Sequence, residues 1–101
     1  MTRRSLLALS LAALVAAGCA FVPPRNLRLD EARRAYQVAA SDPQIAAHAS
    51  AELRQAADIL QQAFHARDTL DDVAVVDHLA YLAGQRVAIA RESAKLRSDS
   101  R

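Results

Sequence analysis

The sequence predicts an all-α protein, in which a short N-terminal helix precedes a long antiparallel helical hairpin. After residue 26 the chain holds one proline, Pro43, and one glycine, Gly84, and it is rich in alanine. Nearly every residue there favours helix over turn. Apolar residues also recur at alternating spacings of three and four, the period of helices that pack on one another as in coiled coils. Together these patterns predict a three-helix arrangement.

Residues 1–18 have the three-part layout of a lipoprotein or secretory signal peptide. Arg3 and Arg4 form a basic head, residues 5–17 are apolar apart from two serines, and small residues precede Cys19. The apolar run of about 13 residues is shorter than the roughly 20 that a membrane-spanning helix needs. We therefore expect a targeting segment rather than a permanent membrane helix.

Cys19 is the only cysteine, and it directly follows the stretch Val15-Ala16-Ala17-Gly18. The stretch resembles a bacterial lipobox, in which diacylglycerol alkylates the thiol, the chain is cut before the cysteine and the new amino group is acylated, for example with palmitate. An unpaired exported thiol also calls for such an explanation. Several acyl chains anchor a protein durably in a membrane.

The residues after Cys19 bear on location. Ala20 follows the cysteine where aspartate commonly marks retention in the inner membrane. The expected location is therefore the periplasmic face of a bacterial outer membrane. The alternatives are the inner membrane, or secretion after an ordinary signal cleavage that leaves a free thiol.

Residues 19–28 are expected to form the lipidated anchor and a short stiff linker, since Pro23 and Pro24 favour extended polyproline geometry. Removing residues 1–18 takes away two of the 13 basic residues, so the remaining charges balance the 11 acidic ones. A chain without net charge lacks the basic field that attracts nucleic acid. The helical domain is expected over residues 29–101, a size that often gains stability from partners.

Three helices are expected in this domain, over residues 30–40, 43–67 and 73–97. Between the first two, Asp42 is suited to capping and Pro43 to the first helical turn. The polar loop before the third helix is short, which makes the second and third helices antiparallel neighbours.

The third helix carries two parallel apolar stripes. The first consists of Val73, Val76, Ala80, Ala83, Val87, Ala90 and Ala94, and the second of Val75, Leu79, Leu82, Ile89 and Leu96. Together they occupy about half the circumference or more, which is wider than one facing helix covers. We expect the second helix to cover one stripe, and the short first helix or another chain to cover the other.

Arg86 interrupts this apolar arc. If the turn is centred near residues 69–70, Arg86 lies almost opposite Glu52. A buried guanidinium needs a carboxylate, so a Glu52–Arg86 contact is predicted. Two other roles stay open: recognition of a partner's carboxylate or an anionic ligand, and extension to solvent along the methylene stem.

Residues with catalytic chemistry are few. His48 and Glu52 stand at i and i+4 as half of a metal site, but local sequence supplies no third ligand, so neither a metal nor a cofactor is expected. A glycine-rich phosphate loop, a nucleophile with its base and an aromatic platform are also missing from the sequence, so we expect no enzyme. Tyr36 and Tyr81 are expected near one another in the core.

Residues 31–48 and 77–92 resemble the DUF4398 family of small, Ala-rich proteobacterial envelope proteins. The matching features are Ala35-Tyr36, Asp42-Pro43, Glu52-Leu53, His78-Leu79-Ala80-Tyr81-Leu82-Ala83 and Gln85-Arg86. The resemblance covers nearly all of the mature chain and implies a lipoprotein. Some members of that family continue into an OmpA-like domain that grips peptidoglycan. This sequence shows no such domain, so direct peptidoglycan binding is not expected.

Two functions fit these observations. The first is a non-catalytic interaction or structural module of the cell envelope, tethered to the outer membrane, that binds another envelope protein or associates with itself. The expected structural or partner contacts are Tyr36, Glu52, His78, Tyr81 and Arg86. The alternative is a small carrier or binding protein for a lipid or other apolar ligand. A carrier needs an apolar cavity lined by large side chains, and alanine-rich seams close such cavities.

Overall fold

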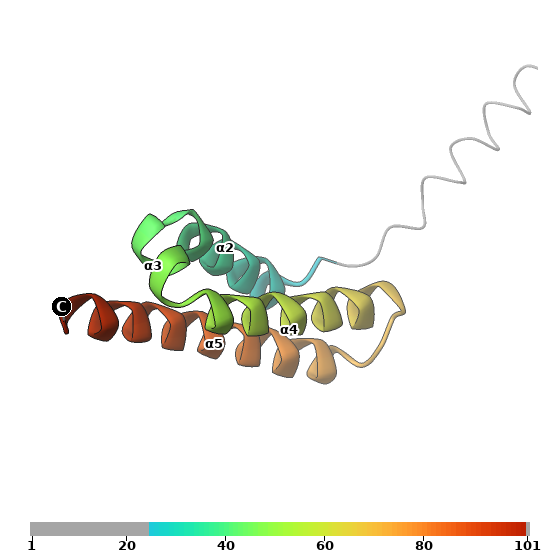
Figure 1. Ribbon diagram of the computed structural model, residues 1–101. Coiled ribbons are helices and arrows are strands. Elements are labelled where there is room, and N and C mark those ends of the chain that lie inside the picture. Colours follow the sequence, from blue (N-terminus) through green and yellow to red (C-terminus); the bar gives the residue numbers. More distant parts are fainter. Residues whose placement is uncertain (1–24, 101) are drawn as a thin grey trace, which may run out of the picture.

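The computed structural model describes residues 25–100, and within this range the chain is helical and contains no strand (Figure 1). The helices are α2 (Leu27–Ser41), α3 (Pro43–His48), α4 (Ser50–Asp68) and α5 (Val73–Asp99). The predicted all-α class is confirmed. The predicted signal peptide, Cys19 and the proline pair lie outside the described residues. None of the helices within the described range has the length and apolarity needed to cross a membrane.

Helix α2 begins three residues earlier than predicted, because Asn26 and not Asp30 is its N-cap. The Asn26 side chain accepts a hydrogen bond from the Leu29 N–H at 3.0 Å and donates one to Asp77 on α5 at 3.0 Å. Asp30 instead lies buried in the first turn and pairs with Arg25 at 2.8 Å. The first turn of α2 is thereby fixed to α5.

The predicted second helix is divided in two. At Ala49 the backbone leaves helical geometry, with φ −137° and ψ 37°, although neither proline nor glycine stands there. Ile45, Ala49 and Leu53 remain in one buried cluster across the break. Arg97 of α5 donates a hydrogen bond to the carbonyl of His48, which has no partner within its own helix. Packing of α3 on the end of α5 therefore accounts for the break.

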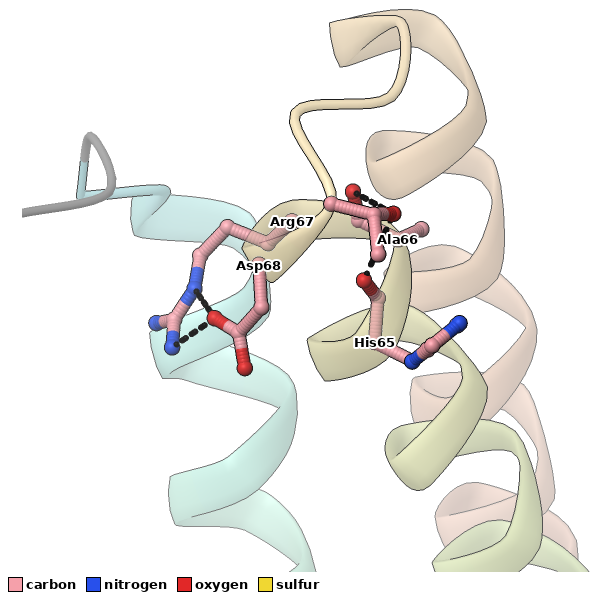
Figure 2. A network of polar contacts seen from close by, with 5 residues as sticks. His65, Ala66, Arg67 and Asp68 are labelled. Atoms are coloured by element: carbon pink, nitrogen blue, oxygen red, sulfur yellow. Dashed lines mark hydrogen bonds and ion pairs between the residues drawn. The ribbon is translucent and has the colours of Figure 1, made fainter.

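A short turn joins α4 to α5, as predicted. The N–H of Asp71 donates to the carbonyl of Ala66 at 2.9 Å, and that of Leu70 to Arg67 at 3.0 Å, which together form a Schellman motif. Figure 2 shows this end of α4, where Arg67 pairs with Asp68 at 2.9 Å. The side chain of Asp72 then accepts from the Ala74 N–H and caps α5. The two helices run antiparallel, side by side (Figure 1).

Helix α5 packs against both α2 and α4, so it is the central helix. Among residues 25–100, alanine supplies ten of the sixteen buried hydrophobic residues, which lets the helix backbones approach closely. The predicted first stripe of α5 is buried from Val76 to Ala94. Val73 is the exception at 64% exposure, because it lies in the first turn of α5, next to the loop.

Candidate interaction site

The second apolar stripe of α5, here called the outer stripe, is only partly covered by the rest of the bundle. It consists of Val75, Leu79, Leu82, Ile89 and Leu96. Val75 is 40%, Ile89 44% and Leu96 62% exposed, whereas Leu79 and Leu82 are half-buried. Either the first helix or another chain was expected to cover this stripe. The first helix does not, because α2 packs near Ala80 and Gly84, on another side of α5.

The spacing of the outer stripe fits a partner helix. Val75, Leu82, Ile89 and Leu96 recur every seven residues, and Leu79 stands four residues after Val75. A coiled-coil seam has two apolar positions in each heptad. Here one position is apolar throughout, and the other holds Leu79, Arg86 and Ser93. Helix α5 thus carries one heptad face inside the bundle and a second, partly apolar face, of which the described part of the chain leaves Val75, Ile89 and Leu96 exposed.

Arg86 lies exposed within the outer stripe, between Leu82 and Ile89 in sequence. It lines a shallow hollow of about 220 Å³ together with Gln55, Asp58 and Ile59 of α4. Of the three roles considered for Arg86, burial against Glu52 is excluded by this exposure. Contact with solvent and contact with a partner both agree with it.

The predicted Glu52–Arg86 contact is wrong, because Glu52 pairs with Arg97. An oxygen of Glu52 lies 2.8 Å from Arg97, and a second contact measures 3.3 Å. Side chains on a helix lean toward its N-terminus. In an antiparallel hairpin, Arg97 therefore reaches back toward Glu52, whereas Arg86 leans toward Asp58. Sequence reasoning missed Arg97 because it placed partners by counting from the turn without this lean.

The Glu52–Arg97 pair is a structural contact. The hydrogen bond from Arg97 lowers the pKa of Glu52 below its ordinary value of 4.5, and the same bond raises the pKa of Arg97. Arg97 also holds the end of α3 through His48, so one side chain joins α3, α4 and α5. Of the half-site considered for His48 and Glu52, the Glu52 carboxylate is thus engaged by arginine, whereas the contact with His48 is to its backbone carbonyl. Within residues 25–100 no group of three potential metal ligands is present.

The two tyrosines occupy different environments. Tyr36 is half-buried and packs against both hydrophobic clusters of the core. Tyr81 is 60% exposed and lines an open groove of about 570 Å³ between α2 and α5, so its predicted core position is wrong. A tyrosine hydroxyl seeks a polar environment, and the groove gives Tyr81 access to solvent. His78 is also exposed on α5.

Gly84 also lines this groove. A Cβ built on Gly84 would meet no atom within 4 Å, so the packing of the bundle does not require glycine there. Charged and polar side chains, those of Arg28, Glu31 and Gln85, line the groove as well. The groove is a second open surface of the molecule, more polar than the outer stripe.

These features define a small all-α protein whose helices pack through alanine and whose described residues leave an apolar helix face partly uncovered. The family model described as a domain of unknown function, DUF4398, matches residues 27–101, and the chain belongs to this family. The resemblance noted in the sequence is thereby confirmed. Neither a curated protein nor a solved structure matches the chain.

Proposed function

We propose that this protein is a non-catalytic interaction module of the bacterial cell envelope, held at a membrane by lipid and binding a partner helix on the outer stripe. One observation carries the proposal. Three large apolar side chains of the outer stripe, spaced by seven or fourteen residues, are 40% to 62% exposed: Val75, Ile89 and Leu96. Exposed apolar faces of this kind mark interaction sites.

The tether is proposed from the sequence. Cys19 follows a lipobox-like stretch, and the alanine at position 20 favours the periplasmic face of the outer membrane. The partner is an envelope protein or a second copy of the chain. Arg86, in the middle of the stripe, favours a partner that brings a carboxylate to this point, because a desolvated guanidinium needs an anionic acceptor.

A carrier role has less support. The hollows that adjoin the helices are open grooves at the surface, and the interior is filled largely by alanine. An apolar ligand of appreciable size therefore finds no enclosed apolar chamber within the described residues.

Site-specific photo-crosslinking in intact cells tests the proposal. A photoreactive residue at Ile89 is expected to give a defined crosslinked protein product. The matched control at Ala88, the next position and also exposed, should give little of it, because it faces away from the stripe. Equal products at both positions would contradict a site on the stripe. Recovery of phospholipid alone would favour the carrier.

A further inference from the structure

We propose that one end of the bundle docks on the surface of a phospholipid bilayer through Leu27, Leu70 and Val73, an inference that rests on the lipid anchor of the proposed function. This end, here called the loop end, consists of the α4–α5 turn, residues 69–72, and the first turns of α2 and α5. Figure 1 shows the turn and the start of α2 toward the same end of the bundle, away from the C-terminal end of α5.

Leu70 combines a strained backbone with an exposed apolar side chain. It is the sole non-glycine residue of the described range with a positive φ, 57°, and it holds the position of the Schellman motif that glycine usually takes. A side chain in this conformation destabilises the fold. The same side chain is 73% exposed, so it gains little from packing within the bundle. In the isolated molecule, leucine at this position therefore carries the cost of the backbone conformation and gains little from burial of its side chain. Contact of the side chain with an apolar phase supplies the missing burial.

Leu70 is not alone at this end. Leu27 is 71% and Val73 64% exposed, and these three side chains are the most exposed large apolar residues of the described range. Leu70 and Val73 line a hollow of about 280 Å³ next to Arg25 and Asn26. Leu27 directly follows Asn26 at the start of α2, so the backbone of this residue lies at the same end of the bundle as Leu70 and Val73.

The described chain begins at the loop end. Asn26 is fixed to Asp77 in α5, and Arg25 lines the loop-end hollow. Six residue steps separate Arg25 from Cys19. A fully extended chain of that length spans roughly 20 Å. Acyl chains on Cys19 therefore hold the loop end, rather than the distant end of α5, close to the bilayer.

The charges around the loop end favour apolar insertion over electrostatic attraction. The basic residues there are Arg25, Arg28 and Arg67, and the acidic ones are Asp30, Asp68, Asp71, Asp72 and Asp77. Arg25 pairs with Asp30 at 2.8 Å and Arg67 with Asp68 at 2.9 Å. A basic field that would require anionic lipid is thus not formed, and docking is expected on zwitterionic phosphatidylcholine.

Single tryptophans test this orientation, because the chain contains none. The acylated protein carrying Leu70→Trp is reconstituted into phosphatidylcholine vesicles with brominated acyl chains, which quench tryptophan by contact. We expect a loss of fluorescence relative to vesicles of unbrominated lipid. Val73→Trp provides a second reporter at the same end, and adding Leu70→Gly to it should weaken its quenching.

The matched control is Leu96→Trp, because Leu96 is similarly exposed, at 62%, but lies at the opposite end of α5. Its fluorescence is expected to stay unchanged in brominated vesicles. Equal quenching at both ends, or no quenching of either loop-end reporter in the acylated protein, would overturn the orientation and leave the anchor standing. An unacylated N-terminus in the mass spectrum of the same sample would overturn both.

Discussion

The backbone conformation of Leu70 destabilises the fold. Its positive φ of 57° costs a residue with a Cβ about 1–2 kcal/mol relative to ordinary helical geometry, and glycine avoids most of this. Leu70→Gly is therefore expected to raise the free energy of unfolding by about 1 kcal/mol in solution. Chemical denaturation of the unlipidated protein measures the change.

Leu70→Ala is the control for this change, since alanine removes the exposed side chain but keeps the Cβ. If the backbone angle is the cause, glycine should exceed alanine in stability. An alanine variant as stable as the glycine variant would show that the exposed side chain, and not the backbone, destabilises the turn.

The lowered pKa of Glu52 makes the free energy of unfolding depend on pH. The hydrogen bond from Arg97 lowers the pKa of Glu52 in the folded state below the ordinary 4.5. A lowered pKa means that the pair stabilises the fold above pH 4.5 and that this contribution disappears as the pH falls through the folded-state pKa. Glu52→Gln should thus be less stable than the wild type at neutral pH, and the difference should shrink in acid.

The measurement for Glu52 is the unfolding free energy of both proteins between neutral and strongly acidic pH. Glu92→Gln is a matched control, because it removes an exposed carboxylate from α5. A difference between wild type and Glu52→Gln that stays constant down to strongly acidic pH would contradict the role of the Glu52 charge.

At the scale of the helix, Gly84 is a weak point of α5. Glycine within a helix is about 1 kcal/mol less favourable than alanine. A Cβ at this position meets nothing within 4 Å, so Gly84→Ala creates no clash. We expect this variant to unfold at a higher denaturant concentration, because its free energy of unfolding rises by about 1 kcal/mol. The reciprocal variant Ala88→Gly, one turn away on the same helix, should lose a similar amount.

The boundaries of the elements show what sequence patterns can and cannot predict. The α4–α5 turn was predictable because polar residues and a capping aspartate, Asp72, mark it in the sequence. The break at Ala49 was not predictable, since its cause is the packing of α3 on α5 and the hydrogen bond that Arg97 donates to the carbonyl of His48. Contacts between residues far apart in sequence leave no local signal of this kind.

The candidate site was predictable to a similar extent. Periodicity found both stripes of α5, because burial on a helix follows the helical repeat. It could not decide which stripe faces α2, since that depends on how α2 is fixed through Asn26 and Asp77. The partner of Glu52 was missed for a geometric reason, the lean of side chains toward the N-terminus of each helix.

In the molecule as a whole, small apolar side chains fill the interior and several large ones lie at the surface. Alanine occupies most of the buried positions, and Leu27, Leu70, Val73 and Leu96 lie more than 60% exposed. The bundle therefore buries little apolar area per helix and keeps large apolar groups at its surface. Contacts with a membrane at the loop end and with a partner on the outer stripe would supply the apolar burial that the isolated domain lacks.

Close approach of the helices is the physical basis of this arrangement, and Ala83 tests it. Ala83 is fully buried in the cluster that joins α2, α4 and α5. Ala83→Leu forces the helices apart and is expected to lower the unfolding free energy by about 1–3 kcal/mol. The same change at exposed Ala88 should stay within about 0.5 kcal/mol of the wild type, because leucine and alanine have similar helix propensities. Denaturation of both variants decides the matter: if Ala83→Leu is tolerated as well as Ala88→Leu, alanine at the seam does not set the spacing of the helices.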